Sequence, residues 1–177
     1  MLLDLTQLHA RHHVERDFAP EAFEPKDPDY RVIAPVALVM DVEKAGGGVF
    51  KVAGTVKARL QLECGRCLEP FEIPVDSAFD LRYVPAIAEN AAEPEREIGD
   101  DDLATTYYQD GKLDVIDLLR EQFQLALPMK PLCTEACQGL CPECGTNLNR
   151  AQCDCTHQWE DPRLAALKGL LKPEKEN

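Results

Sequence analysis

Eight cysteines are the residues whose type and spacing point most directly to chemistry. They form four close pairs: Cys64 with Cys67, Cys133 with Cys137, Cys141 with Cys144, and Cys153 with Cys155. Tetrahedral zinc binds four sulfurs at about 2.3 Å each, so neighbouring sulfurs must lie roughly 3.8 Å apart. C-x-x-C and C-x-x-x-C turns deliver that spacing, and in C-x-C both side chains leave one face of a strand. We therefore predict two structural zinc ions (Zn²⁺) per chain, held by all eight cysteines.

The redox environment decides whether such cysteines serve as disulfides or as metal ligands. Asp4 interrupts the short apolar run at the N-terminus, which has neither a basic lead nor a small-residue cleavage site, so we expect no secretory signal. No stretch of the sequence approaches the run of about 18 apolar residues that spans a membrane. We therefore expect a cytoplasmic protein, in which disulfides rarely persist and metal sites are favoured.

Two groupings of the four pairs into four-ligand sites are open. In the preferred grouping, one site joins a strand hairpin to the segment after the main helix, and the second site closes a local loop. The first site would use Cys64, Cys67, Cys133 and Cys137, and the second Cys141, Cys144, Cys153 and Cys155. The rival grouping joins Cys133, Cys137, Cys141 and Cys144 in one more local site. His157 could replace Cys155, but we favour an exposed histidine near Trp159.

Antiparallel strands are expected to position the first pair. Residues 36–84 show a period-two pattern, broken by a glycine turn that ends at Gly48 and by the turn that holds Cys64 and Cys67. One face of the long strand before Cys64 is apolar: Val52, Gly54, Val56, Ala58, Leu60 and Leu62. The opposite face carries Lys57, Arg59, Gln61 and Glu63. The alternation resumes at Phe71 and continues to Tyr83, while Pro74 indicates an edge strand or a bulge. This pattern favours an antiparallel meander or a small open barrel.

A helix over residues 113–127 is the clearest helical prediction. Asp114 can cap its N-terminus, and Pro128 ends it. Ile116, Leu119, Phe123 and Ala126 recur at helical spacing, so we expect this stripe to pack on the sheet. A second, short helix is predicted at Arg163–Leu171, with Pro162 at its first position.

The elements together predict an α+β fold in one domain, residues 1–177. Residues 1–84 form the strand-rich part with the first cysteine turn, and 85–104 an acidic surface loop or linker. Residues 105–177 hold the main helix, the zinc-bound cysteine-rich segment and the short terminal helix. Near the N-terminus, Leu3, Leu5 and Leu8 suggest a short strand or turn. Residues 20–35, rich in proline and charge, are interpreted as an extended connector.

The net charge of −13 limits the possible partners. Nucleic-acid binding depends on lysine and arginine, so a chain this acidic is expected to meet a basic protein or to touch RNA through one local patch. Lys57, Arg59 and Arg66, close to the first cysteine turn, are the candidate contacts. An ordinary solvated strand face explains these three residues equally well.

Signatures of catalysis are absent from the sequence. There is no H-E-x-x-H, no Walker loop and no G-x-S-x-G. The zinc deaminase pattern needs H-x-E and P-C-x-x-C, but no H-x-E exists and Leu140 precedes Cys141. His9, His12 and His13 have the character of surface residues. We therefore expect no enzyme and no small-molecule substrate.

Two segments of the sequence resemble a known family. Leu62-Glu-Cys-Gly-Arg-Cys-Leu-Glu-Pro70 and the run from Leu127 through Cys-Pro-Glu-Cys-Gly to Asn149 are similar to the YceD family of large ribosomal RNA subunit accumulation proteins. The resemblance implies a bacterial or plastid factor needed for normal levels of large-subunit ribosomal RNA. Some family members keep C-x-R-C but lack the second cysteine turn, which fits two separable zinc sites and favours the first grouping.

These observations lead to one main hypothesis and two alternatives. The main hypothesis is a non-enzymatic ribosome-assembly factor whose partner is a ribosomal protein or a large-subunit rRNA precursor. The first alternative is a zinc-ribbon regulator that binds the transcription machinery. The second is a thiol redox sensor. A thioredoxin-like pair would open a helix, however, and Cys64 and Cys67 lie between two predicted strands.

Overall fold

The computed structural model of the chain describes residues 1–8, 10–24, 27, 29–86 and 104–155. Its strands are β1 (Leu2–Asp4), β2 (Arg11–Phe18), β3 (Arg31–Val32), β4 (Val36–Gly46), β5 (Val49–Glu63), β6 (Pro70–Pro85), β7 (Thr105–Tyr108) and β8 (Lys112–Asp114). Its helices are the 3-10 helices η1 (Leu5–Gln7) and η2 (Pro20–Phe23) and the α-helix α2 (Val115–Ala126). In this part of the chain, no helix combines the length and apolar character that a membrane span requires.

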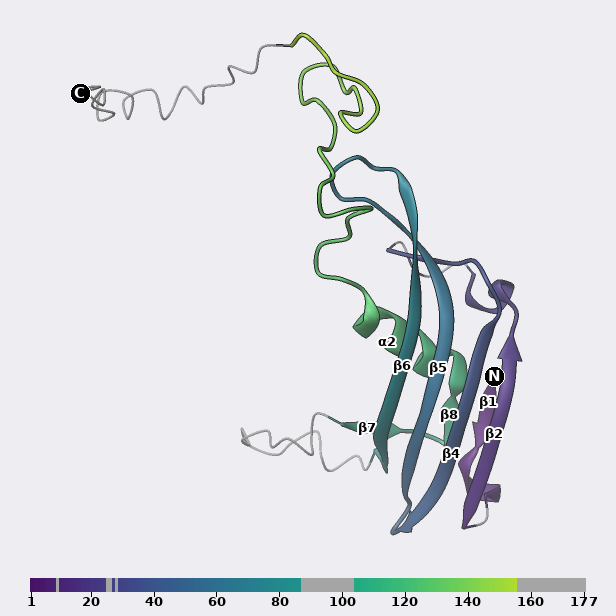
Figure 1. The fold of residues 1–177 in the computed structure, drawn as a ribbon. Helices are drawn as coiled ribbons and strands as arrows, with labels where there is room; N and C mark the ends of the chain where they lie inside the picture. Colours follow the sequence, from purple (N-terminus) through teal and green to yellow (C-terminus); the bar gives the residue numbers. More distant parts are fainter. Residues whose placement is uncertain (9, 25–26, 28, 87–103, 156–177) are drawn as a thin grey trace, which may run out of the picture.

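One mixed sheet forms the body of the molecule (Figure 1). Its strand order is β2-β4-β5-β6-β7, and β3 pairs with β5 beyond the last β4 pair. The β4-β5-β6 meander confirms the antiparallel prediction, and the described strands do not close into a barrel. The parallel pairing of β6 with β7 was not predicted. A parallel neighbour needs a connection of about a dozen residues or more, and the acidic stretch from 86 to 104 supplies that length.

The long central strand β5 follows the predicted alternation closely. Val52, Val56 and Leu60 are fully buried on one face, whereas Lys57 and Arg59 are exposed on the other. The alternation continues in β6, where Pro74 pairs with Arg59 in an unbroken register. Because β7 reaches only as far as Arg82, Pro74 lies on a free edge of β6 among the described strands, as predicted, and makes no bulge.

The helix α2 lies across the apolar face of the sheet (Figure 1). The Asp114 carboxylate accepts a hydrogen bond of 2.9 Å from the Ile116 amide, which confirms the predicted cap. Leu119 and Phe123 are fully buried, but Ile116 and Ala126 are only partly buried. The buried face also includes three residues outside the predicted stripe, Val115, Leu118 and Gln122.

The segment before β4 corrects the prediction of an extended connector over residues 20–35. It contains η2 and β3, and it folds back onto α2 through aromatic contacts. The Phe123 ring lies 5.4 Å from the Phe23 ring and 5.8 Å from the Tyr30 ring, measured between centroids. Burial of these rings outweighs the extended preference of the surrounding prolines.

The N-terminal residues also contain more structure than predicted. The short opening strand and turn are present as β1 and η1, and β1 pairs with β8 in a separate two-stranded sheet. The edge strand β2 was missed because its exposed polar residues, including His12 and His13, give no apolar alternation. His9, most of the acidic loop and the terminal helix predicted at Arg163–Leu171 lie outside the described residues.

Gly54 provides a test of the contact between β4 and β5. A Cβ atom added there would lie 2.4 Å from the Val39 carbonyl oxygen and 2.6 Å from the Met40 Cβ. Because the Val39 oxygen belongs to the backbone, the strands would have to separate. We expect Gly54→Ala to lower the free energy of unfolding by about 1–3 kcal/mol, measured by urea denaturation. The exposed neighbour Ala53 is the control: Ala53→Val should be neutral or slightly stabilising, and an equal loss in both variants would contradict the close contact.

Candidate metal centres

The tip of the β5–β6 hairpin forms the first cysteine turn. The Cys64 amide donates to the Glu69 carbonyl oxygen at 2.9 Å, and the Leu68 amide donates to the Cys64 carbonyl oxygen at 2.9 Å. The Gly65 amide reaches across to the Pro131 carbonyl oxygen at 2.8 Å. This last bond attaches the hairpin tip to the segment that follows α2.

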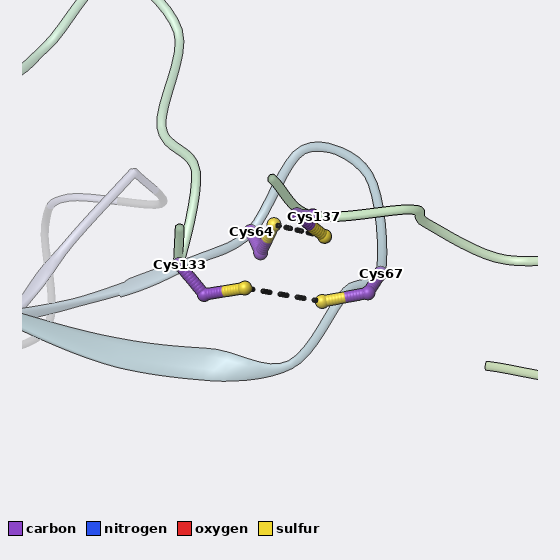
Figure 2. Close-up of side chains that lie close together, drawn as sticks. All are labelled: Cys64, Cys67, Cys133 and Cys137. Atoms are coloured by element: carbon purple, nitrogen blue, oxygen red, sulfur yellow. Dashed lines mark hydrogen bonds between the residues drawn. The ribbon is translucent and has the colours of Figure 1, made fainter. Parts of the chain in front are cut away.

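Four sulfurs converge where these two segments meet. Figure 2 shows Cys64 and Cys67 of the hairpin pointing toward Cys133 and Cys137 of the following segment. The Sγ atoms are 3.8 Å apart between Cys64 and Cys137, and 3.7 Å apart between Cys67 and Cys133. All four sulfurs lie within 4.8 Å of one another, and all four cysteines are free. This spacing is compatible with a tetrahedral zinc ion and far too long for a disulfide bond.

Local hydrogen bonds divide the charge unevenly within this first cluster. Backbone hydrogen bonds from Cys133 and Cys67 stabilise the thiolate of Cys64 and lower its pKa to about 6. A backbone hydrogen bond from Glu69 favours the thiolate of Cys67, but burial and the neighbouring thiols outweigh it and raise that pKa to about 12. The Asn149 side-chain amide donates to the Cys137 sulfur at 3.3 Å. The Cys64 thiol therefore ionises more readily than the Cys67 thiol, and a bound cation would favour the thiolate form.

The second cysteine turn repeats the backbone geometry of the first. The Cys141 amide donates to the Thr146 carbonyl oxygen at 2.8 Å, and the Gly145 amide donates to the Cys141 carbonyl oxygen at 2.8 Å. Gly145 therefore occupies the position that Leu68 occupies in the first turn. Both residues have positive φ, 74° at Gly145 and 60° at Leu68. The two turns thus share one backbone conformation. The second turn has glycine at the position of positive φ, whereas the first has a leucine, whose backbone is strained there.

The second cluster is more open to solvent than the first. It contains Cys141, Cys144, Cys153 and Cys155, whose sulfurs also lie within 4.8 Å of one another. Cys141 is buried, but Cys144 and Cys155 are exposed, whereas three of the four cysteines in the first cluster are buried. A side-chain hydrogen bond with Thr146 lowers the pKa of Cys144 to about 6, and the adjacent Cys144 raises the pKa of Cys155 to about 12.

Polar contacts hold the second cluster's loop against the first cysteine turn. The Arg66 guanidinium donates to the carbonyl oxygens of Cys137 at 2.7 Å and Glu135 at 3.3 Å. The Leu140 amide donates to the Arg66 carbonyl oxygen at 3.1 Å. The Glu69 carboxylate accepts from the Asn147 side chain at 3.1 Å and pairs with Arg150. The two clusters thus have separate sets of cysteines, but hydrogen bonds and an ion pair connect the segments that carry them.

The structure brings the cysteines together in the preferred grouping and not in the rival one. His157, the proposed substitute for Cys155, lies outside the described residues. The sequence reasoning missed Glu69, Asn147 and Asn149, which connect the clusters or contact a sulfur. In the sequence, the only indication of these three residues was their position shortly after a cysteine turn.

The three candidate RNA contacts all have partners within the chain. Lys57 pairs with Asp76 at 3.5 Å, and Arg59 pairs with Glu72 at 3.3 Å, both across β5 and β6. Arg66 lies apart from them at the hairpin tip, on the backbone carbonyls of the cysteine segment. Exposed ion pairs of this kind are weak, so Lys57 and Arg59 remain candidates for a contact, whereas Arg66 has a structural task.

Comparison with known proteins connects the chain to a group of relatives. The family described as large ribosomal RNA subunit accumulation protein YceD matches residues 52–171, a range that includes both cysteine clusters. An uncharacterized protein of Mycobacterium tuberculosis is 34% identical over 140 residues, which are 78% of this chain and 63% of that protein. No solved structure matches the chain.

Two plant proteins carry a functional name. Large ribosomal RNA subunit accumulation protein YCED homolog 1, chloroplastic, of Zea mays is 28% identical over 164 residues, which are 78% of this chain and 54% of that protein. The Arabidopsis thaliana protein of the same name is 25% identical over 169 residues, covering 80% of this chain and 50% of that protein. The chain thus spans between half and two thirds of the length of these relatives.

The grouping of the cysteines predicts two different mutant phenotypes. We expect Cys141→Ser in metal-loaded protein to unfold the segment after residue 137 while the sheet persists, because the second cluster closes a local loop. We expect Cys64→Ser to destabilise the whole fold, because its cluster joins distant segments. Far-UV circular dichroism and urea unfolding distinguish the two results. Equal and global loss of structure in both variants would contradict separate sites.

The strained position Leu68 predicts a stabilising substitution. A non-glycine residue in the left-handed region costs about 1–2 kcal/mol, and the Leu68 side chain is 62% exposed, so little burial is lost with it. We expect Leu68→Gly to raise the free energy of unfolding by about 1 kcal/mol, measured by urea denaturation of metal-loaded protein. Leu68→Ala keeps the Cβ atom and should bring no gain. If the alanine variant were as stable as the glycine variant, backbone strain would not be the cause.

Proposed function

The chain belongs to the YceD family of large ribosomal RNA subunit accumulation proteins, and from this membership we propose that it is a non-enzymatic factor that supports assembly of the large ribosomal subunit. Two structural zinc ions stabilise its cysteine clusters. Its site of action is the cytoplasm, where large-subunit precursors of a bacterial cell are assembled. Neither a membrane nor a small-molecule substrate takes part.

The arrangement of the first cluster carries the structural, non-catalytic part of this proposal. Four cysteine sulfurs surround one point at tetrahedral spacing, so a zinc ion there has a complete set of protein ligands. A catalytic zinc keeps one position open for water or substrate, and this set leaves none. Three of the four cysteines are also buried where the hairpin meets the cysteine segment, which suits an ion that holds two segments together.

Charge favours a protein partner over direct contact with RNA. The net charge is −13, and Lys57, Arg59 and Arg66 all have partners in the chain. RNA binding would require these cations to exchange their present partners for phosphates while the surrounding carboxylates repel the RNA. A basic ribosomal protein meets no such repulsion, because its lysines and arginines pair with the same carboxylates.

A purification from cells tests this proposal directly. The tagged chain is purified natively, with and without ribonuclease, and its zinc content, co-purified proteins and RNA are measured. We expect two zinc ions per chain and a large-subunit ribosomal protein that stays bound after ribonuclease treatment. Deletion of the gene that encodes the chain should lower the amount of large-subunit rRNA relative to small-subunit rRNA. Expression of the wild-type chain should restore the normal ratio.

Matched variants separate protein contact from RNA contact. Lys57→Gln with Arg59→Gln removes two of the candidate RNA contacts, both on β5, and Lys44→Gln with Lys51→Gln removes equal charge at the other end of the β4–β5 pair. We expect both pairs to restore rRNA levels equally. Failure of the first pair alone would favour direct RNA binding. Recovery of RNA polymerase subunits would support the transcription regulator instead, and metal-free, reversibly oxidised cysteines would support the redox sensor.

A further inference from the structure

An open groove of about 630 Å³ lies beside the first cysteine cluster. One wall is the end of β5 at Gln61–Glu63, and another is the segment from Leu127 to Pro131 that leads from α2 to Cys133. The groove reaches the cluster directly, because Glu63 precedes Cys64 and the Pro131 carbonyl accepts the Gly65 amide. Neither the metal sites nor the core packing uses this space.

The strand β5 has an unpaired edge at this groove. β4 covers β5 only as far as Lys57, and β3 covers Leu60 and Gln61. The Arg59 carbonyl accepts from the Ile33 amide, so Arg59 faces the β3 side of the sheet. Alternate residues of an antiparallel strand face the same edge, so Glu63 also faces that side. Its amide and carbonyl lie beyond the last β3 pair and have no strand partner there among the described residues.

The groove is acidic with apolar walls. Its charged lining residues are Asp27, Asp29 and Glu63 against the single cation Arg31, which already faces Glu24 at 3.8 Å. Prolines 128 and 131 supply apolar surface that suits the aliphatic stems of lysine or arginine. A segment rich in lysine or arginine can thus place its charged groups beside the carboxylates and its aliphatic stems against the prolines.

Tyr30 forms a buried part of the groove wall. Its ring packs against Phe123, and the residue is buried. Its hydroxyl is covered and lies beside the Asp27 carboxylate, and burial together with this carboxylate raises the pKa of Tyr30 above its usual range. Tyr30 thus contributes surface to the groove, not a hydrogen-bonding group.

From the open strand edge and the acidic lining, we infer that this groove binds an extended lysine- or arginine-rich segment of a partner protein. The segment continues the position of β3 as an added antiparallel strand beside Glu63. Its cationic side chains face Asp29 and Glu63, and its apolar portions lie against the proline wall. The identity of the partner as a ribosomal protein rests on the proposed function, but the chemistry of the groove does not.

A defined peptide tests the inference with the full-length, zinc-loaded chain. The probe is a fluorescein-labelled decapeptide of alternating lysine and threonine, and its affinity is measured by fluorescence anisotropy. We expect Asp29→Asn with Glu63→Gln to weaken binding about tenfold, because two groove charges are lost. Glu15→Gln with Asp80→Asn removes equal charge from the exposed face of β2 and β6 and should change binding less than twofold. Equal weakening in both pairs would reduce the effect to general attraction and overturn the inference.

Hydrogen exchange locates the peptide independently of charge. We expect peptide binding to slow amide exchange in fragments that contain Glu63, and to leave the β2–β4 hydrogen bonds unchanged. Absence of protection near Glu63, or a labelled decauridylate that binds at the groove in place of the peptide, would overturn the inference.

The peptide experiment stands apart from the test of the proposed function. If the wild-type chain binds the peptide at the groove but deletion leaves rRNA levels unchanged, the proposed function fails and the inference holds. If deletion lowers rRNA but the wild-type chain does not bind the peptide, the inference fails and the proposed function holds.

Discussion

The meeting of four sulfurs at the end of the sheet is the contact on which the C-terminal half of the structure depends. Cys64 and Cys67 belong to a rigid hairpin tip, whereas Cys133 and Cys137 belong to a segment with almost no regular structure. That segment has few apolar side chains to bury, so the hydrophobic effect alone cannot hold it. The zinc ion proposed for this cluster would provide the missing attraction, and the backbone bond from Gly65 to Pro131 fixes the approach.

The second cluster repeats the smallest structural unit of the first cluster, the cysteine turn. Both cysteine turns close with the same pair of backbone hydrogen bonds, and both need a residue with positive φ after the second cysteine. The first turn tolerates a leucine there because the sheet and the buried sulfurs already hold it in place. The second turn is more exposed and has no sheet beneath it, so it uses Gly145, which adopts the conformation without strain. Burial therefore decides how much local strain each turn can carry.

The parts of the fold that could be predicted from the sequence are those determined by local pattern. Alternation indicated the faces of β5, and Asp114 indicated the start of α2. Cysteine spacing indicated four pairs, and the family resemblance favoured the grouping into the two clusters that the structure brings together. The missed parts depend on distant contacts. The segment around Tyr30 folds back because Phe123 buries it, and β7 joins the sheet in parallel because a long connection permits it. Neither cause is visible within a window of neighbouring residues, which is the range that periodicity can read.

The distribution of charge and the incomplete sheet both indicate the groove beside Glu63 as the binding region. In a chain of net charge −13, Lys57, Arg59 and Arg66 near the hairpin tip have partners within the chain, and the charged lining of the groove is mainly carboxylate. The sheet is also incomplete there, because β3 is only two residues long and Glu63 has no strand partner among the residues that the structure describes. An unpaired strand edge is usually protected, since it otherwise recruits foreign strands. Here the cysteine cluster anchors the edge and carboxylates surround it, so the edge accepts only segments that are extended and positively charged. The hairpin tip contributes to recognition indirectly, because the bond from the Gly65 amide to the Pro131 carbonyl holds the Leu127–Pro131 wall beside this edge, and the proposed zinc ion would reinforce the contact.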